Sequence, residues 1–106
     1  MKTVKKVNID PVYVEYMPDV LEGGKLYTSK KYSIAIHSCP CGCGNRVVTP
    51  LDEIVTEFGK TVTEMPKNGW ILTEKRNRIT ITPSIGNYGF PCKSHYIITN
   101  NIANFI

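Results

Sequence analysis

Three of the four cysteines lie within five positions of one another, in segment 37–44, which reads HSCPCGCG. Sulfur side chains that alternate with proline and glycine in this way predict a turn lined with soft metal ligands. The fourth cysteine, Cys92, lies far along the chain in segment 90–95, which reads FPCKSH. A metal site that uses both segments ties the two halves of the chain together, and this constrains the fold more than any other feature of the sequence.

The cysteines are expected to bind a metal rather than to form disulfides. The first eight residues, MKTVKKVN, contain no apolar run that can act as the core of a signal peptide, and no segment approaches the length of a membrane span. We therefore expect a cytoplasmic protein that makes no membrane contact. Cysteines stay reduced in that compartment, and a disulfide between cysteines separated by one residue would be strained.

The spacing of the cysteines sets a requirement on the backbone. A tetrahedral zinc site has Zn–S distances of about 2.3 Å, which places neighbouring sulfur atoms roughly 3.8 Å apart. Residues i and i+2 of an extended strand lie about 6.6 Å apart, so the chain has to curl, as Gly42 and Gly44 permit. The first-choice ligands for Zn2+ are Cys39, Cys41, Cys43 and Cys92. His37 or His95 can replace one of them.

The number of ligands decides what the metal can do. Four cysteines leave no open coordination position, so the zinc would be structural and would close the long loop between Cys43 and Cys92. Three ligands would leave a position for an activated water and make the site hydrolytic. Cysteine-rich zinc sites are usually closed, which favours the structural role.

The chain of 106 residues predicts a single metal-binding domain over residues 1–106. Short runs rich in β-branched and aromatic residues predict a mostly β, small zinc-stabilised antiparallel domain. These runs lie at residues 4–16, 26–28, 32–36, 70–73, 78–82, 96–99 and 102–106. The fourth and fifth runs are expected to form a hairpin with Ile79 and Ile81 inward. The last two join through Asn100 and Asn101, because asparagine tolerates positive φ.

One short helix is expected near residues 50–58, which would make the fold α+β. Thr49 can cap it, Pro50 suits the first helical position and Gly59 can end it. Its apolar residues follow the helical spacing i, i+3, i+4 and i+7: Leu51, Ile54, Val55 and Phe58. This spacing predicts that one stripe of the helix packs on the core.

Ser84 and His95 are the candidate catalytic residues. A serine needs a nearby base to become a nucleophile, and the chain contains two histidines, His37 and His95. Ser84 lies where a strand runs into a turn with Gly86, in which backbone N–H groups can hold an oxyanion. The residues equally allow Ser84 to make a turn hydrogen bond and His95 to be structural. Ser94 is adjacent to His95 and could use it only if the local backbone bent.

The order of the motifs resembles a known family. CPCGCG at residues 39–44, PSIGN at 83–87 and PCxSHY at 91–96 resemble a family of small uncharacterised bacterial and phage domains. Some of these are encoded beside ubiquitin-like proteins and their E1-like and E2-like enzymes. The resemblance implies a cysteine-bound metal, an intracellular location and partners among these proteins. It also implies a peptidase that processes or removes the ubiquitin-like modifier, with Ser84 and His95 at the catalytic positions.

Three functions are open at this point. The first is a zinc-stabilised peptidase with a serine nucleophile and a histidine base, and the alternative is a non-catalytic zinc-binding protein-interaction module of the same pathway. Nucleic-acid binding is a weaker third hypothesis. The 13 basic and 9 acidic residues give a formal charge of 13 − 9 = +4, without the dense basic stripe typical of nucleic-acid binders.

Overall fold

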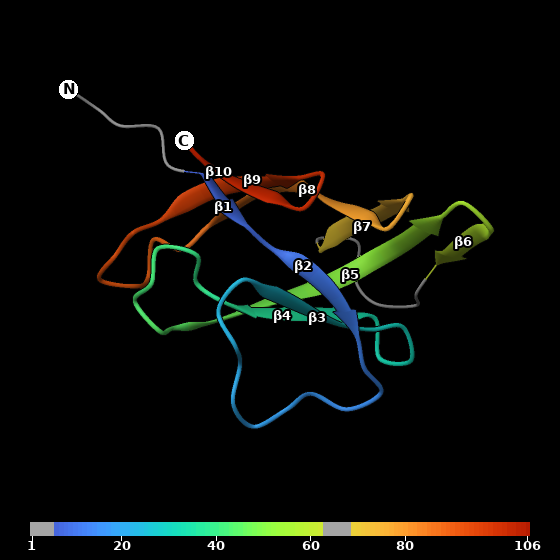
Figure 1. Ribbon diagram of the computed structural model, residues 1–106, viewed down its shortest axis with the longest axis horizontal. Coiled ribbons are helices and arrows are strands. Elements are labelled where there is room, and N and C mark those ends of the chain that lie inside the picture. The colour runs from blue at the N-terminus through green and yellow to red at the C-terminus, as the bar shows by residue number, and fades with distance from the viewer. Residues whose placement is uncertain (1–5, 63–68) are drawn as a thin grey trace.

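The computed structural model describes residues 6–62 and 69–106, and within them the chain forms strands and no helix (Figure 1). The prediction of a mostly β protein is confirmed. The strands are β1 (Lys6–Asn8), β2 (Asp10–Tyr13), β3 (Lys25–Ser29), β4 (Ile34–Ser38), β5 (Arg46–Thr56), β6 (Gly59–Val62), β7 (Trp70–Lys75), β8 (Arg78–Gly86), β9 (His95–Thr99) and β10 (Ile102–Phe105). In the same residues, no helix is long and apolar enough to cross a membrane.

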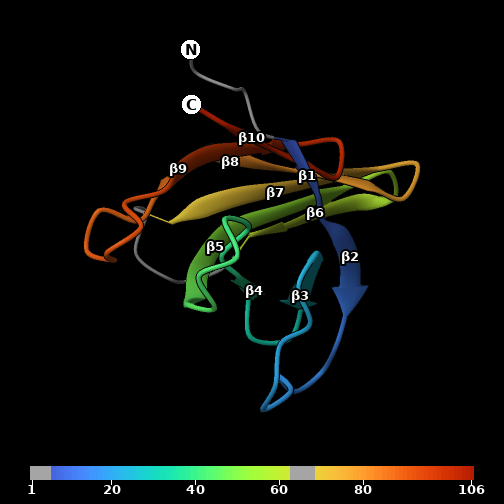
Figure 2. The same cartoon turned by 60° about the vertical axis from the view of Figure 1, so that its left-hand side comes forward.

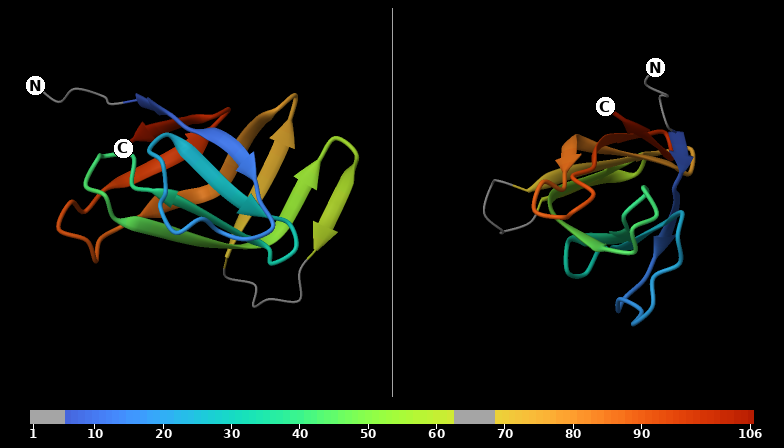
Figure 3. Two further views of the ribbon diagram at one scale, coloured as in Figure 1. Left: turned by 60° about the horizontal axis from the view of Figure 1, so that its bottom comes forward. Right: turned by 90° about the vertical axis from the view of Figure 1, so that its left-hand side faces the viewer.

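All ten strands belong to one sheet, which curls until its two ends meet. The strand order is β1-β10-β9-β8-β7-β5-β4-β3-β2, with β6 paired to β5. The end strands β1 and β2 are separated in the chain by Ile9 alone, which holds the two ends of the sheet beside each other. Ile9 is buried, and its N–H donates to the Asn101 carbonyl at 2.7 Å. The result is a nearly closed barrel (Figure 2, Figure 3).

Alternate residues of the strands fill the barrel. The hydrophobic core cluster consists of Ile9, Leu26, Ala35, Cys39, Val47, Leu51, Ile54, Leu72, Ile79, Ile81, Ile85, Tyr96, Ile98 and Ala103. In β9, Tyr96 and Ile98 are buried while Ile97 is exposed, so His95 lies on the outer face with Ile97. Burial of each large aliphatic side chain contributes about 1.5–3 kcal/mol to folding.

The strand pairing is mixed rather than purely antiparallel. Most neighbours are antiparallel as predicted, but β2–β3 and β5–β7 are parallel. Both predicted hairpins are present. The turn at 76–77 joins β7 to β8, the turn at 100–101 joins β9 to β10, and all four turn residues have positive φ. Ile79 and Ile81 point into the core as predicted.

The predicted helix at 50–58 is wrong, because these residues lie in β5 and in the turn that follows it. The β5–β7 register shifts between Leu51 and Glu53, and this β-bulge places both Leu51 and Ile54 in the core. Leu51 and Ile54 are therefore both buried at the i, i+3 spacing that is also typical of the buried face of a helix. Phe58, which a helix would bury, is 97% exposed.

The strands differ in length, and two loops occupy the end of the barrel where β5 and β8 extend past β7. β7 begins at Trp70, opposite Leu51, so the first part of β5 extends past the start of β7. β8 also continues beyond Thr82, which is its last residue paired with β7. Loop 39–45 leads into β5 and loop 87–94 follows β8. These two loops carry all four cysteines.

Candidate functional site

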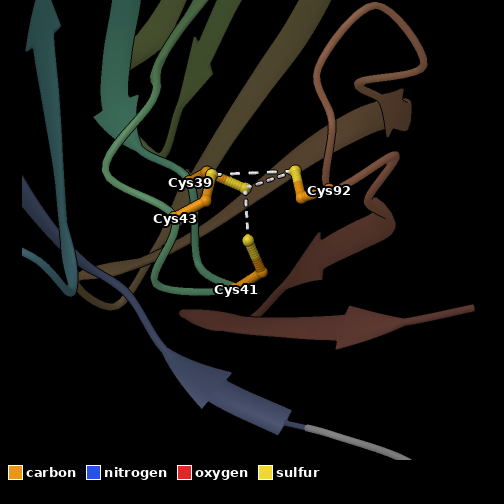
Figure 4. A group of neighbouring side chains, drawn as sticks. All are labelled: Cys39, Cys41, Cys43 and Cys92. Carbon is orange, nitrogen blue, oxygen red and sulfur yellow. Dashed lines mark hydrogen bonds between the residues drawn. The ribbon is translucent and has the colours of Figure 1, made fainter.

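Four cysteine sulfur atoms from the two loops point toward one another at this end of the barrel (Figure 4). All four lie within 4.8 Å of one another. The Sγ atom of Cys39 is 3.4 Å from that of Cys41 and 4.0 Å from that of Cys92. The Sγ atoms of Cys43 and Cys92 are 3.6 Å apart. These distances bracket the roughly 3.8 Å expected around a tetrahedral zinc ion, so the cluster can hold one metal ion.

Two glycines give loop 39–45 its curl. Gly42 and Gly44 have φ angles of 90° and 83°, a region that other L-residues rarely adopt. The Gly42 N–H donates to the Cys39 carbonyl at 3.0 Å, and the Cys39 N–H donates to the Asn45 carbonyl at 2.8 Å. The predicted curl is therefore present, and it turns the alternate cysteines toward a single point.

Hydrogen bonding and burial shift the pKa values of the cysteine thiols in opposite directions. The backbone N–H of Asn45 lowers the pKa of Cys43 to about 6, and Asn45 Nδ2 lies 3.2 Å from the same sulfur. Burial raises the pKa of Cys41 to about 12 and raises the pKa of Cys39 as well. A bound cation would stabilise the thiolate form of all four side chains. An all-sulfur set of donors suits a metal such as zinc.

Neither histidine belongs to the cysteine cluster. His37 is buried, and its Nε2 atom lies 2.6 Å from the Tyr96 hydroxyl. Burial lowers the pKa of His37 to about 4, so its ring is neutral at pH 7. The His95 ring contacts Ser84 instead. The geometry therefore favours the four-cysteine set over the alternatives in which a histidine replaces a cysteine.

Ser84 and His95 meet on the outer face of the barrel. His95 Nε2 lies 2.9 Å from Ser84 Oγ, within the range for a nucleophile and its general base. Gly86 pairs with His95, and Ser84 lies two residues before Gly86, so all three share one face of the sheet. The β8–β9 register shifts between Ile81 and Ile85, and such bulges re-aim side chains.

The side chains of Ser84 and His95 are half-buried, and other residues pack closely around them. Trp70 Nε1 donates to the Ser84 carbonyl at 3.3 Å and so restrains the main chain at the serine. The centroids of the Tyr88 and His95 rings are 5.7 Å apart. The Tyr88 ring also packs against Gly86, where an added Cβ atom would be 2.6 Å from Tyr88 Cε2. Within residues 6–62 and 69–106, no carboxylate makes a hydrogen bond to His95. In that part of the chain, Ser84 and His95 therefore form a two-residue pair with no acidic third member.

Ser94, the other candidate nucleophile, points away from His95. It is buried, and its Oγ lies 3.2 Å from Cys39 Sγ and 3.6 Å from Cys92 Sγ. Successive residues of an extended chain point to opposite faces, so Ser94 faces the interior while His95 faces outward. Ser94 therefore belongs to the surroundings of the cysteine cluster.

The sequence patterns did not reveal the polar network that connects the two sites. Asn87 Nδ2 donates to Ser94 Oγ at 3.0 Å and to the Tyr96 hydroxyl at 3.3 Å. Burial raises the pKa of Tyr96, so its hydroxyl keeps its proton. A signal was present, because Asn87 ends the PSIGN motif and Tyr96 ends the PCxSHY motif. The motifs that contain the candidate reactive residues also contain the residues that support them.

No curated protein and no solved structure matches the chain significantly. A family model does match, and its description reads Bacterial ubiquitination-like system serine protease (BubE). The match spans residues 13–106, so it contains the four cysteines, Ser84 and His95. The chain therefore belongs to the BubE family of bacterial ubiquitination-like system serine proteases.

Proposed function

We propose that the protein is a zinc-stabilised serine peptidase that processes or removes a ubiquitin-like protein in a bacterial ubiquitin-like conjugation pathway. The observation that carries this proposal is the 2.9 Å separation of Ser84 Oγ and His95 Nε2 in a member of a serine protease family. Its partners are then the ubiquitin-like protein or its E1-like and E2-like enzymes. A cytoplasmic location agrees with cysteines that have to stay reduced to bind metal.

Ser84 is the nucleophile and His95 is the general base. His95 Nε2 takes the hydroxyl proton as Ser84 Oγ bonds to the carbonyl carbon of the scissile peptide or isopeptide bond. The C–N bond then breaks, and the imidazolium gives its proton to the departing amine. A water molecule attacks the resulting acyl-serine with the same help from His95, which releases the acid and restores Ser84.

The Gly86 N–H is the candidate donor to the oxyanion. The Asn87 N–H is engaged, because it donates to the Ser94 carbonyl at 2.7 Å. Residue pairs of an antiparallel ladder alternate between hydrogen-bonded and non-hydrogen-bonded, so the pair of Gly86 and His95 is of the second kind. The Gly86 N–H then points away from β9. Loss of one such donor lowers kcat by roughly 10²–10³-fold in other serine peptidases.

The four cysteines would hold one Zn2+ in a closed site: Cys39, Cys41, Cys43 and Cys92. When bound, the ion supplies structural stability and no catalytic water, because four thiolates occupy every position of a tetrahedral site. Loop 87–94 begins directly after β8, which carries Ser84, and ends directly before His95. Anchoring this loop to loop 39–45 therefore restrains the connection between the nucleophile and its base.

Cleavage of a ubiquitin-like protein with a C-terminal extension tests the proposal. The metal-loaded protein is incubated with this fusion, and products are measured by mass spectrometry. We expect Ser84→Ala and His95→Ala to reduce the rate by about 10²-fold or more. Thr73→Ala, which removes an exposed hydroxyl from β7, is the matched control and should cleave normally. Undiminished cleavage by both folded dyad variants would reject the proposed mechanism.

A non-catalytic zinc-binding interaction module is the second candidate. It is favoured by the closed cysteine set and by the lack, within residues 6–62 and 69–106, of a carboxylate partner for His95. A fluorophosphonate probe separates the two candidates, because it labels an activated serine and not an ordinary one. Labelling of Ser84 that is lost in His95→Ala supports the peptidase, whereas binding of the ubiquitin-like protein without labelling or turnover supports the module.

A further inference from the structure

We infer that Asn87 is a positioning residue for the Ser84–His95 pair, and this inference rests on the proposed function. Its side chain holds the two neighbours of His95 in the sequence, Ser94 and Tyr96. The inference assigns Asn87 no contact with the substrate. Its role is to fix the main chain on both sides of the base, and so the approach of His95 Nε2 to Ser84 Oγ.

Three hydrogen bonds from one residue make up this clamp. Asn87 Nδ2 donates to Ser94 Oγ at 3.0 Å and to the Tyr96 hydroxyl at 3.3 Å. The backbone N–H of Asn87 donates to the Ser94 carbonyl at 2.7 Å. Ser94 and Tyr96 face the interior and His95 faces outward, so the clamp acts from the face opposite to the reactive pair.

The ladder between β8 and β9 needs such support at this point. Its register shifts between Ile81 and Ile85, so the segment that contains Ser84 lacks the regular pairing that fixes strand positions elsewhere. Beyond the shift, the ladder continues through the pairs of Ile85 with Tyr96 and Gly86 with His95, and the backbone bond from Asn87 to Ser94 follows them. A displacement of about 1 Å between reacting groups can lower a rate by 10²-fold.

Both acceptors of the Asn87 amide are themselves anchored. Ser94 Oγ lies 3.2 Å from Cys39 Sγ, and the Tyr96 hydroxyl lies 2.6 Å from His37 Nε2. Ser94 and Tyr96 are both buried. Asn87 therefore connects the buried surroundings of the cysteine cluster to the strand that carries His95.

The kinetics of Asn87→Ala test the inference. We expect kcat to fall by about 10–100-fold while KM stays within about threefold, because geometry is lost and substrate contacts are kept. Asn104→Ala is the matched control, since Asn104 is a half-buried asparagine on β10 that bonds to the Ile102 carbonyl of its own strand. It should keep its kcat. If Asn87→Ala fails to fold, Asn87→Leu keeps a similar size without any hydrogen-bonding group and should show the same loss.

A double variant distinguishes positioning from general destabilisation. If Asn87 acts through His95, Asn87→Ala added to His95→Ala should lower the residual rate by less than about twofold. A further loss of about tenfold or more, or equal kcat values for Asn87→Ala and Asn104→Ala, overturns the inference. Loss of activity in Ser84→Ala with normal kcat in Asn87→Ala overturns this inference alone. Normal activity in Ser84→Ala overturns the proposed function and this inference with it.

Discussion

Replacement of Cys92 separates the long-range part of the metal site from its local part. Three of the sulfur ligands come from loop 39–45, so Cys92 is the one ligand of the four that ties that loop to the other half of the chain through the metal. Cys92 is 49 positions from Cys43 and 53 from Cys39. In the chain-entropy treatment of cross-links, closing a loop of about 50 residues contributes roughly 4 kcal/mol at 25 °C. A metal bridge closes the loop in the same sense.

We therefore expect Cys92→Ala to lower the free energy of unfolding by about 4 kcal/mol more than Cys41→Ala does. The two variants are matched, because each removes one sulfur from a half-buried position. Cys41→Ala leaves Cys39 and Cys43 connected to Cys92 through the metal, whereas Cys92→Ala opens the long loop. The difference between the variants isolates the contribution of loop closure from that of a lost ligand.

Denaturant unfolding followed by Trp70 fluorescence measures this difference. With zinc present, stability should fall in the order wild type, Cys41→Ala, Cys92→Ala. With a strong chelator the three proteins should converge, since no cross-link remains in any of them. Metal analysis establishes that the variants are loaded. Equal stability of the two zinc-loaded variants would refute the idea that the cluster joins the halves of the barrel.

Five further substitutions test the fold and the site. Leu51→Ala should lower the free energy of unfolding by about 2–5 kcal/mol, and Phe58→Ser should change it by less than about 0.5 kcal/mol. Thermal denaturation measures both values. If residues 50–58 formed a helix packed on the core, both substitutions would be strongly destabilising. Tyr96→Phe leaves the buried His37 Nε2 without its hydroxyl partner and removes one of the two acceptors of Asn87 Nδ2, so it should cost roughly 1–3 kcal/mol in a urea titration. Gly86→Ala forces the Tyr88 ring aside and should lower the cleavage rate, and Tyr88→Ala in the same chain should recover part of it.

The grouping of the cysteines was more predictable from the sequence than its surroundings. Cys39, Cys41 and Cys43 can meet Cys92 only if the backbone curls, and two glycines in the right places permitted the curl. The turn at 100–101 was predictable for a similar reason, because asparagine tolerates positive φ. The curl of the cysteine loop and the turn at 100–101 depend on cysteine, glycine and asparagine, which have few other roles in such short segments. The local sequence is therefore enough to predict both features.

Long-range pairing was not predictable in the same way. The spacing of Leu51 and Ile54 fits both a helix and a strand with a bulge, and only the pairing of β5 with β7 decides between them. The closure of the barrel depends on Ile9, which nothing in the local sequence distinguishes from the other apolar residues of its run. The Asn87 network was missed because its partners come together only when β8 and β9 pair.

The closed cysteine set leads to a prediction about the metal itself. The cysteine cluster contacts the inward-facing Ser94, directly before β9, whereas Ser84 on β8 and His95 on β9 lie on the outer face of the sheet. On the proposed mechanism, a metal in this position would support the geometry of Ser84 and His95 and would take no part in the reaction. Replacing zinc with cobalt should therefore change kcat by less than about threefold, since four thiolates hold either ion without an open position. Cleavage assays on proteins of equal metal content measure this, and the cobalt spectrum reports tetrahedral sulfur ligation. If kcat changed by about tenfold or more, the metal would take part in the chemistry and its ligand set would need an open position.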